Sequence, residues 1–120
     1  MKIHKIAGGF TAARGFKAAS CEAGIKYQNR KDMALLFADV PCAVAGTFNS
    51  NRVKAAPVLW DQQIVDFSEE VHAVVINSGI ANAATGAEGL ENCRVTAEAA
   101  EVALSVPEGS YLKGVVMRAL

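Results

Sequence analysis

The chain has 120 residues, of which 52% are hydrophobic, and its 12 basic and 12 acidic side chains balance to a net charge of zero. This balance argues against a nucleic-acid or polyanion binder, which would carry a basic surplus. Polar or charged residues interrupt every apolar run before it reaches membrane-spanning length, so we expect no membrane segment. The length fits one domain at most, or a piece of one, and we treat residues 1–120 as a single, incomplete N-terminal portion of a domain.

The termini and the cysteines point to a cytosolic setting. Basic residues at the N-terminus have no continuous apolar stretch behind them, so we predict no signal peptide and a cytoplasmic location. Cys21, Cys42 and Cys93 are odd in number and far apart. They fit reduced, mostly buried thiols better than a disulfide framework or a zinc site.

The first half of the chain predicts short strands separated by turns. Residues 33–38, MALLFA, form a continuous apolar run between turn residues, which favours a buried strand. Residues 39–41 close it and 42–48 resume as a strand, so 33–48 predicts a hairpin. Shorter extended segments are expected at 2–6 (a strand or an ordered tail), 10–13, 16–21 and 24–27.

The second half predicts a long helix after a strand. Pro57 makes 53–60 an edge strand or a broken one, and 61–67 has the spacing of a short helix. The β-branched run 74–76 indicates a buried strand. A helix follows from about 87 to 104, with an apolar stripe of Leu90, Cys93, Ala97, Ala100 and Leu104 and with Glu91, Arg94, Glu98 and Glu101 largely outside it.

Thr85 and Glu88 have the spacing of a capping box at the start of this helix. After the helix, residues 114–117 are apolar enough to predict one more strand. Several short strands and one long helix predict an α+β, or layered α/β, fold in which the helix lies on the sheet.

The loop between the strand at 74–76 and the long helix is the candidate ligand site. It is rich in Gly and Ala, which allow a ligand or another backbone to approach closely, and a helix N-terminus favours an anion. Asn77, Asn82 and Thr85 are the candidate substrate-binding residues. The same pattern also fits a tight connection packed on the sheet, with the asparagines bonding their own loop.

The sequence gives less support for a metal site, a catalytic nucleophile or a carboxylate-binding site elsewhere in the chain. His4 and His72 are isolated, so a metal site is not expected, and no G-x-S-x-G elbow marks a nucleophile. The thiols lie in apolar strings, where they stay protonated. Arg52 and Lys54 flank a turn and either hold a carboxylate or are surface charges.

Three strings carry a resemblance to a known family: GFKAASCEAGIK at 15–26, DMALLFADVPCAVAGTFNSNRVKAAPV at 32–58 and VVINSGIANAATG at 74–86. In order and spacing they resemble the N-terminal region of the ornithine acetyltransferases, also called glutamate N-acetyltransferases. The resemblance runs to about Ser110, and its NRVKAAPV and NSG-x-ANA-x-TG strings are specific to that family.

The resemblance implies a layered α/β fold and acetyl transfer from N-acetylornithine to glutamate in arginine biosynthesis. It implies no resident cofactor, and some members also use acetyl-CoA. In the family the precursor cuts itself before a Thr, which becomes the N-terminal nucleophile of a second subunit. A Thr-Gly pair late in the first subunit builds the oxyanion hole.

This chain departs from the family pattern in its tail and its loop. The family's nucleophile Thr would follow residue 120, so the resemblance implies a missing C-terminal half or second subunit as partner. Near the end the sequence aligns Lys113 and Gly114 with the oxyanion-hole pair, where Lys does not reproduce a hydroxyl. Ile80 and Ala84 stand where the family usually has Asn and Cys.

Three interpretations follow, and we favour the first. The chain is the front part of an acetyltransferase, inactive alone, with apolar surface exposed where elements such as 33–48 pack against the missing half. Alternatively, it is a subunit that works with a second chain supplying the Thr. The third interpretation is a non-catalytic binding or interaction module, which Ile80 and the altered tail favour over the second.

Overall fold

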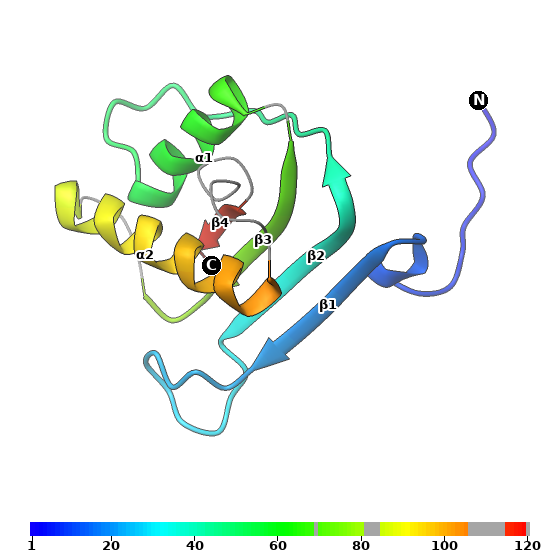
Figure 1. Ribbon diagram of the computed structural model, residues 1–120, viewed down its shortest axis with the longest axis horizontal. Coiled ribbons are helices and arrows are strands. Elements are labelled where there is room, and N and C mark those ends of the chain that lie inside the picture. The colour runs from blue at the N-terminus through cyan, green and yellow to red at the C-terminus, as the bar shows by residue number, and fades with distance from the viewer. Residues whose placement is uncertain (69, 81–84, 106–114, 120) are drawn as a thin grey trace.

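The computed structural model describes residues 1–68, 70–80, 85–105 and 115–119, with the backbone alone for the last of these ranges (Figure 1). Within these residues, four strands form one sheet in the order β1-β2-β3-β4, with two α-helices packed on it. β2 is antiparallel to β1 and β3, whereas β4 is parallel to β3. The α+β prediction is confirmed. The elements are η1 (Phe10–Ala12), β1 (Phe16–Cys21), β2 (Met33–Cys42), α1 (Ala56–Phe67), β3 (Val71–Asn77), α2 (Gly86–Leu104) and β4 (Val115–Ala119).

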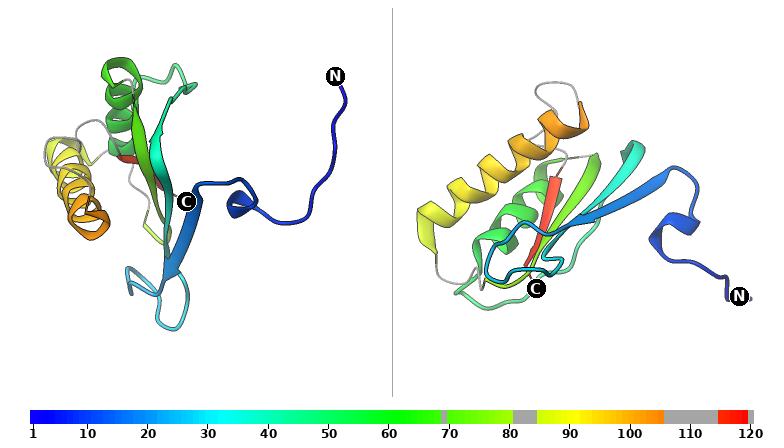
Figure 2. Two further views of the ribbon diagram at one scale, coloured as in Figure 1. Left: turned by 45° about the vertical axis from the view of Figure 1, so that its right-hand side comes forward. Right: turned by 90° about the horizontal axis from the view of Figure 1, so that it is seen from below.

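Both helices cover the same face of the sheet, and the hydrophobic core lies between the two layers (Figure 2). Along β3 the buried residues alternate with partly exposed ones, as expected when successive side chains point to opposite faces. Burial of apolar surface between the layers favours this arrangement. The core residues are Ala56, Trp60, Ile64, Val71, Ala73, Val75, Cys93 and Ala97.

Asp32 fixes the long connection between β1 and β2. Its carboxylate accepts the backbone N–H groups of Ala23 at 2.6 Å and Ile25 at 2.8 Å. Its carbonyl accepts the N–H of Ser78 at 2.9 Å, just beyond β3. The pKa of the Asp32 carboxyl is lowered because these backbone donors favour its charged form. The side chain of Asp32 therefore holds the loop 22–31, and its backbone carbonyl ties the loop to the end of β3.

The sequence prediction was wrong around Pro57. Residues 53–60 form no strand, because α1 begins at Ala56 and runs through the helix expected at 61–67. Pro57 lies in the first turn of α1, where its missing N–H costs no helical hydrogen bond. Proline therefore starts this helix. The described part of the chain has two α-helices on the sheet, and the first of them is longer than the short helix expected at 61–67.

The predicted hairpin at 33–48 was also wrong. β2 continues through residues 39–41 to Cys42 and pairs with β1 and β3, and residues 43–48 have no regular structure. The pairing of β2 with β3 shifts register between Phe37 and Cys42, the stretch that contains Pro41. Proline cannot donate to the ladder, which agrees with an irregularity there.

Smaller differences concern the N-terminal region and the cysteines. Residues 2–6 have no regular structure, 10–13 hold the 3-10 helix η1, and 24–27 form no strand. Phe16–Cys21 is the strand predicted, and the strand expected at 114–117 is β4. All three cysteines are free thiols, but Cys21 is exposed and Cys42 is only partly buried, so just Cys93 fits the expected burial.

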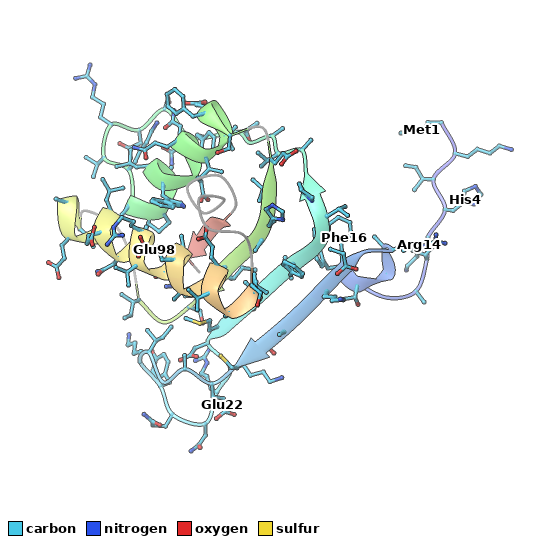
Figure 3. The ribbon with its side chains drawn as sticks, viewed as in Figure 1. Met1, His4, Arg14, Phe16, Glu22 and Glu98 are labelled. Atoms are coloured by element: carbon cyan, nitrogen blue, oxygen red, sulfur yellow. The ribbon has the colours of Figure 1, made fainter. Side chains whose placement is uncertain are left out.

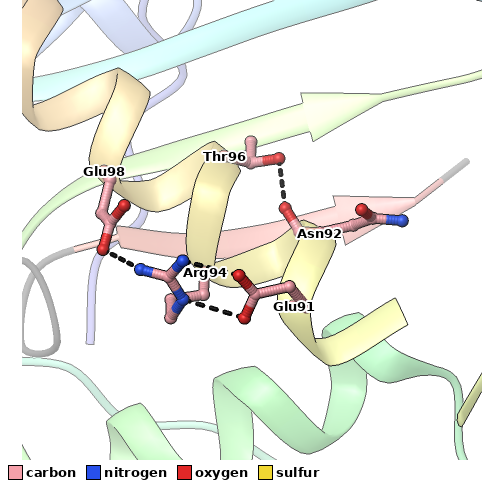
Figure 4. Close-up of polar contacts among 5 residues, drawn as sticks. All are labelled: Glu91, Asn92, Arg94, Thr96 and Glu98. Atoms are coloured by element: carbon pink, nitrogen blue, oxygen red, sulfur yellow. Dashed lines mark hydrogen bonds and ion pairs between the residues drawn. The ribbon is translucent and has the colours of Figure 1, made fainter. Parts of the chain in front are cut away.

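Helix α2 follows its predicted bounds and presents charge on its outer face (Figure 4). Arg94 donates through Nε to Glu91 at 2.9 Å and pairs with Glu98 one turn further on. Glu101 was expected outside the apolar stripe, but its side chain is buried. It follows Cys93 and Ala97 at four-residue spacing and therefore lies on the core-facing side of α2, before Leu104. Neither described helix is long and apolar enough to cross a membrane.

Candidate functional site at the end of strand β3

A pocket of about 110 Å³ lies where β3 ends and α2 begins. It is smaller than the roughly 300–1,000 Å³ of pockets for drug-sized ligands, so it fits a small polar ligand or one end of a larger one. Its walls combine apolar side chains with amide and hydroxyl groups, and none of them carries a formal charge. The lining residues are Met33, Ala56, Pro57, Val75, Asn77, Thr85, Gly89, Asn92, Cys93 and Thr96.

Two of the predicted site residues, Asn77 and Thr85, meet in this pocket. Asn77 ends β3 and pairs with Met33 of β2, another lining residue. Thr85 is the residue before α2. Their positions agree with a ligand site at this junction. Asn82 lies outside the described residues.

The turn after β3 is packed tightly against the β1–β2 loop. Gly79 has a φ of 98°, a left-handed conformation that favours glycine. A Cβ on Gly79 would lie 3.2 Å from Cβ of Lys26, so the two loops are in contact. Ile80, which follows, is 48% exposed.

The expected capping box is not formed at Thr85. Its side chain makes no capping hydrogen bond, and its φ of −88° and ψ of −3° are helical. An N-cap side chain reaches the first turn from extended backbone, which explains the failure. The carbonyl of Thr85 instead accepts the N–H of Gly89 at 3.2 Å, and its hydroxyl lies against Gly89.

Two polar residues of the pocket, Asn92 and Thr96 on α2, were not predicted from the sequence. Thr96 donates its hydroxyl to the carbonyl of Asn92 at 2.7 Å (Figure 4). Helical spacing could have identified them, because Asn92 follows Gly89 by three residues and Thr96 follows Cys93 by three. Residues at this spacing lie on the same side of a helix. They add hydrogen-bonding capacity to the wall opposite the end of β3.

The pocket holds one thiol, that of Cys93. Burial raises the pKa of Cys93, and the carboxylate of Asp61 adds to that effect. The thiol form therefore dominates at neutral pH. Since the thiolate is the nucleophile, the buried Cys93 acts as part of the wall and not as an attacking group.

The remaining candidate residues lie elsewhere. Lys54 donates to Gln62 of α1 at 3.0 Å, and neither Lys54 nor Arg52 lines the pocket. His4 lies on the N-terminal tail, away from the sheet (Figure 3), and His72 is on β3. The described residues hold no group of three His, Cys, Asp or Glu side chains suited to a metal ion.

Lys113 and Gly114, the candidate oxyanion-hole residues, lie outside the described residues. The strand that follows them is informative, because β4 is parallel to β3 and Val115 pairs with Ala73. Ala73 precedes Asn77 by four residues, or about 13 Å along a strand. β4 therefore begins away from the pocket and ends beside Asn77, whose partner is Ala119.

The sheet, its one-sided helical layer and the pocket define an α+β fold with a partly polar pocket at a strand–helix junction. The family model for the ArgJ family matches residues 17–118. The chain therefore belongs to the ArgJ family.

Named relatives agree with this assignment. The arginine biosynthesis bifunctional protein ArgJ of Mycolicibacterium paratuberculosis is 49% identical over 98 residues, covering 81% of this chain and 24% of that protein. The Streptomyces coelicolor protein of the same name is 51% identical over 100 residues, covering 82% of this chain and 26% of that protein. The chain thus spans about a quarter of the length of the curated relatives it matches.

Two solved structures share the fold. Ornithine acetyltransferase of Mycobacterium tuberculosis, in complex with ornithine, matches with a TM-score of 0.81 at 45% identity, covering 93% of this chain and 60% of that chain. ArgJ of Bacillus halodurans matches with a TM-score of 0.80 at 31% identity, covering 94% of this chain and 58% of that chain.

Proposed function

We propose that this chain forms the substrate-binding front part of a glutamate N-acetyltransferase, which moves an acetyl group from N-acetylornithine to glutamate in arginine biosynthesis. The observation that carries the proposal is family membership across residues 17–118. The Mycobacterium tuberculosis relative, which shares the fold at 45% identity, was solved with ornithine. That complex supports an amino-acid substrate for this chain.

The pocket at the end of β3 offers groups that suit an acetylated amino acid. Amides such as Asn77 and Asn92 both donate and accept hydrogen bonds, as a substrate amide requires. Met33 and Val75 supply apolar wall for a methyl group. We assign Asn77, Asn82 and Thr85 to substrate binding. Charged ends of the substrate need partners outside this pocket, because its walls carry no charge.

The nucleophile must come from elsewhere in the enzyme. Among the described residues, the pocket thiol Cys93 is held protonated by burial. The family resemblance implies a Thr that follows the region matched here, and we propose that a part of the enzyme outside these 120 residues supplies it. We assign Lys113 and Gly114 to the oxyanion-hole positions. Acetyl-CoA is an alternative acetyl donor, and no resident cofactor is proposed.

A chimera tests the proposal. Residues 17–118 replace the matching region of the Mycobacterium tuberculosis relative, and acetyl transfer from N-acetylornithine to glutamate is followed by chromatography. We expect transfer by the chimera and none by the 120-residue chain alone, because the proposed nucleophile Thr lies outside these 120 residues. A folded chimera without transfer would contradict the proposal.

A pair of matched variants tests the pocket within the active chimera. Asn77→Ala should raise KM roughly tenfold, since it removes a hydrogen bond to bound substrate. Asn49→Ala, an exposed loop position outside the pocket, should leave KM unchanged. Equal KM values in the two variants would remove Asn77 from the substrate site.

One observation favours binding without catalysis as a second candidate. Ile80 exposes an apolar side chain beside the pocket loop, where the family usually has Asn. Calorimetry of the chain alone with ornithine, glutamate and their acetylated forms separates the candidates. Heat of binding combined with an inactive chimera would favour the binding module, whereas an active chimera would exclude it.

A further inference from the structure

The uncharged pocket at the end of β3 does not provide for the charged end of an amino-acid substrate. An amino acid acetylated on its α-nitrogen carries the acetyl group and the α-carboxylate on the same carbon, so the carboxylate binds next to the acetyl group. A carboxylate removed from water needs a positive or hydrogen-bonding partner. Lys54, two residues before the lining residue Ala56, already donates to Gln62 at 3.0 Å. Free cations beside the pocket would meet this need, and the β1–β2 loop has two.

The β1–β2 loop lies against the end of β3, as two views of the molecule show (Figures 1 and 2). Where this loop enters β2, Met33 pairs with Asn77 of β3, and both residues line the pocket. The turn that leaves Asn77 touches the loop, because a Cβ on Gly79 would lie 3.2 Å from Cβ of Lys26 and 4.0 Å from Cδ2 of Tyr27. Lys26 and Tyr27 are therefore neighbours of the pocket wall.

Two cations of the loop meet at one aromatic ring. Nζ of Lys26 is 5.2 Å and Cζ of Arg30 is 5.0 Å from the centre of the Tyr27 ring, within the range of a cation–π contact. The two charges thus lie within about 10 Å of each other, which is one Debye length at 0.1 M salt. Neither cation forms an ion pair with another described residue, and the carboxylate of Asp32 is occupied by backbone N–H groups of the loop. Two like charges that converge without an acidic partner favour the binding of an anion.

We propose that Lys26 and Arg30 bind the α-carboxylate of the amino acid whose acetyl end occupies the pocket. Tyr27 is a positioning residue, since its ring holds both cations beside the turn at Gly79. The site therefore selects amino acids with a free α-carboxylate over their esters and amides. This inference rests on the proposed function, because it names the residues that recognise the charged end of the same substrate.

A matched pair of ligands tests this carboxylate subsite on the full 120-residue chain. N-acetylornithine and its α-carboxamide differ in the charge of that one group, and calorimetry measures the Kd of each. We expect the unaltered chain to bind the acid about tenfold more tightly than the amide. Lys26→Met and Arg30→Met should each lower this ratio about threefold, and the double variant should bring it to about one. Lys31→Met removes an equal charge from the same loop, away from Tyr27, and should keep the ratio.

The ratio separates recognition from folding, because a merely structural role would weaken the binding of acid and amide alike. Lys26→Arg retains the charge and should retain the ratio. An unchanged ratio in the double variant, equal Kd values for acid and amide in the unaltered chain, or no binding of either ligand would each overturn the subsite.

The chimera distinguishes a failure of this subsite from a failure of the proposed function. In an active chimera the double variant should raise KM for both N-acetylornithine and glutamate, because both carry an α-carboxylate. Unchanged KM values, or a rise confined to glutamate, would overturn the subsite while the proposed function stands. A folded chimera without transfer, combined with the expected ratio in calorimetry, would overturn the proposed function while the subsite stands.

Discussion

Gly89 lies where α2 comes closest to its neighbours. A Cβ at this position would overlap the hydroxyl of Thr85 and lie 2.6 Å from its Cβ and 2.9 Å from Cβ of Ala56. The hydroxyl can rotate away, but the Cβ of Ala56 on α1 cannot. Gly89 therefore sets how closely the two helices approach beside the pocket, and it positions Thr85.

We expect Gly89→Ala to lower the free energy of unfolding by about 1–3 kcal/mol, because overpacking outweighs the helix propensity of about 1 kcal/mol that alanine gains. Urea denaturation measures the change. Gly9→Ala is the control, since a Cβ at Gly9 meets no atom within 4 Å. A Gly89→Ala protein as stable as the unaltered one would show that moving α1 and α2 apart costs no more than the about 1 kcal/mol of helix propensity that alanine gains.

A second prediction at the scale of a single residue concerns Asp32, which holds the loop 22–31. Asn in its place keeps one oxygen acceptor but turns an NH₂ group toward a backbone N–H, so the loop 22–31 loses one of its two hydrogen bonds to this side chain and the charge assistance of the other. We expect amide exchange at Ala23 and Ile25 to accelerate roughly tenfold or more in Asp32→Asn. Hydrogen-exchange mass spectrometry measures it.

Asp39→Asn is the matched control, because the side chain of Asp39 forms an exposed ion pair with Lys17 at 2.9 Å. Unchanged exchange at Ala23 and Ile25 in Asp32→Asn would mean that the loop is held by its other contacts, such as the packing of Gly79 on Lys26.

At the scale of the elements, the helix and the strand that were predicted correctly are those with a regular pattern of apolar residues. The apolar stripe of α2 and the β-branched run of β3 each identify an element whose burial decides its structure. Pro57 was misassigned because proline fits both an edge strand and the first turn of a helix. Asn77 and Thr85 were found because they flank one loop, whereas Asn92 is brought to the pocket only by the turn of α2.

Glu101 makes α2 sensitive to pH. Burial, with Glu98 adding to it, raises the pKa of Glu101 from its ordinary 4.5 to about 7, and its Oε1 has no hydrogen-bond partner among the described residues. Between these values the unfolded chain releases a proton that the folded chain retains. The free energy of unfolding therefore falls as pH rises from about 4.5 to 7, by at most about 1.4 kcal/mol per pH unit.

The Glu101→Gln variant should lose this part of the pH dependence, since the amide stays neutral throughout. Denaturant unfolding at half-unit intervals from pH 4.5 to 8 measures the slope relative to the unaltered chain. Glu70→Gln, at an exposed position before β3, should keep the original slope. Identical slopes in all three proteins would show that Glu101 titrates normally in the folded state.

At the scale of the whole molecule, stability rests on a core between the sheet and a single helical layer. Trp60 lies at its centre with 6% of its surface exposed, whereas Phe67, on the same helix, is 83% exposed. Removing a buried aromatic ring costs about 3–5 kcal/mol, a large part of the roughly 5–15 kcal/mol that holds a domain folded.

Trp60→Ala should therefore unfold much of the isolated chain at 25 °C, whereas Phe67→Ala should change its stability by about 0.5 kcal/mol or less. Thermal unfolding followed by circular dichroism compares the two variants. A cooperative, unshifted transition in Trp60→Ala would mean that the one-sided core is not what holds this chain together.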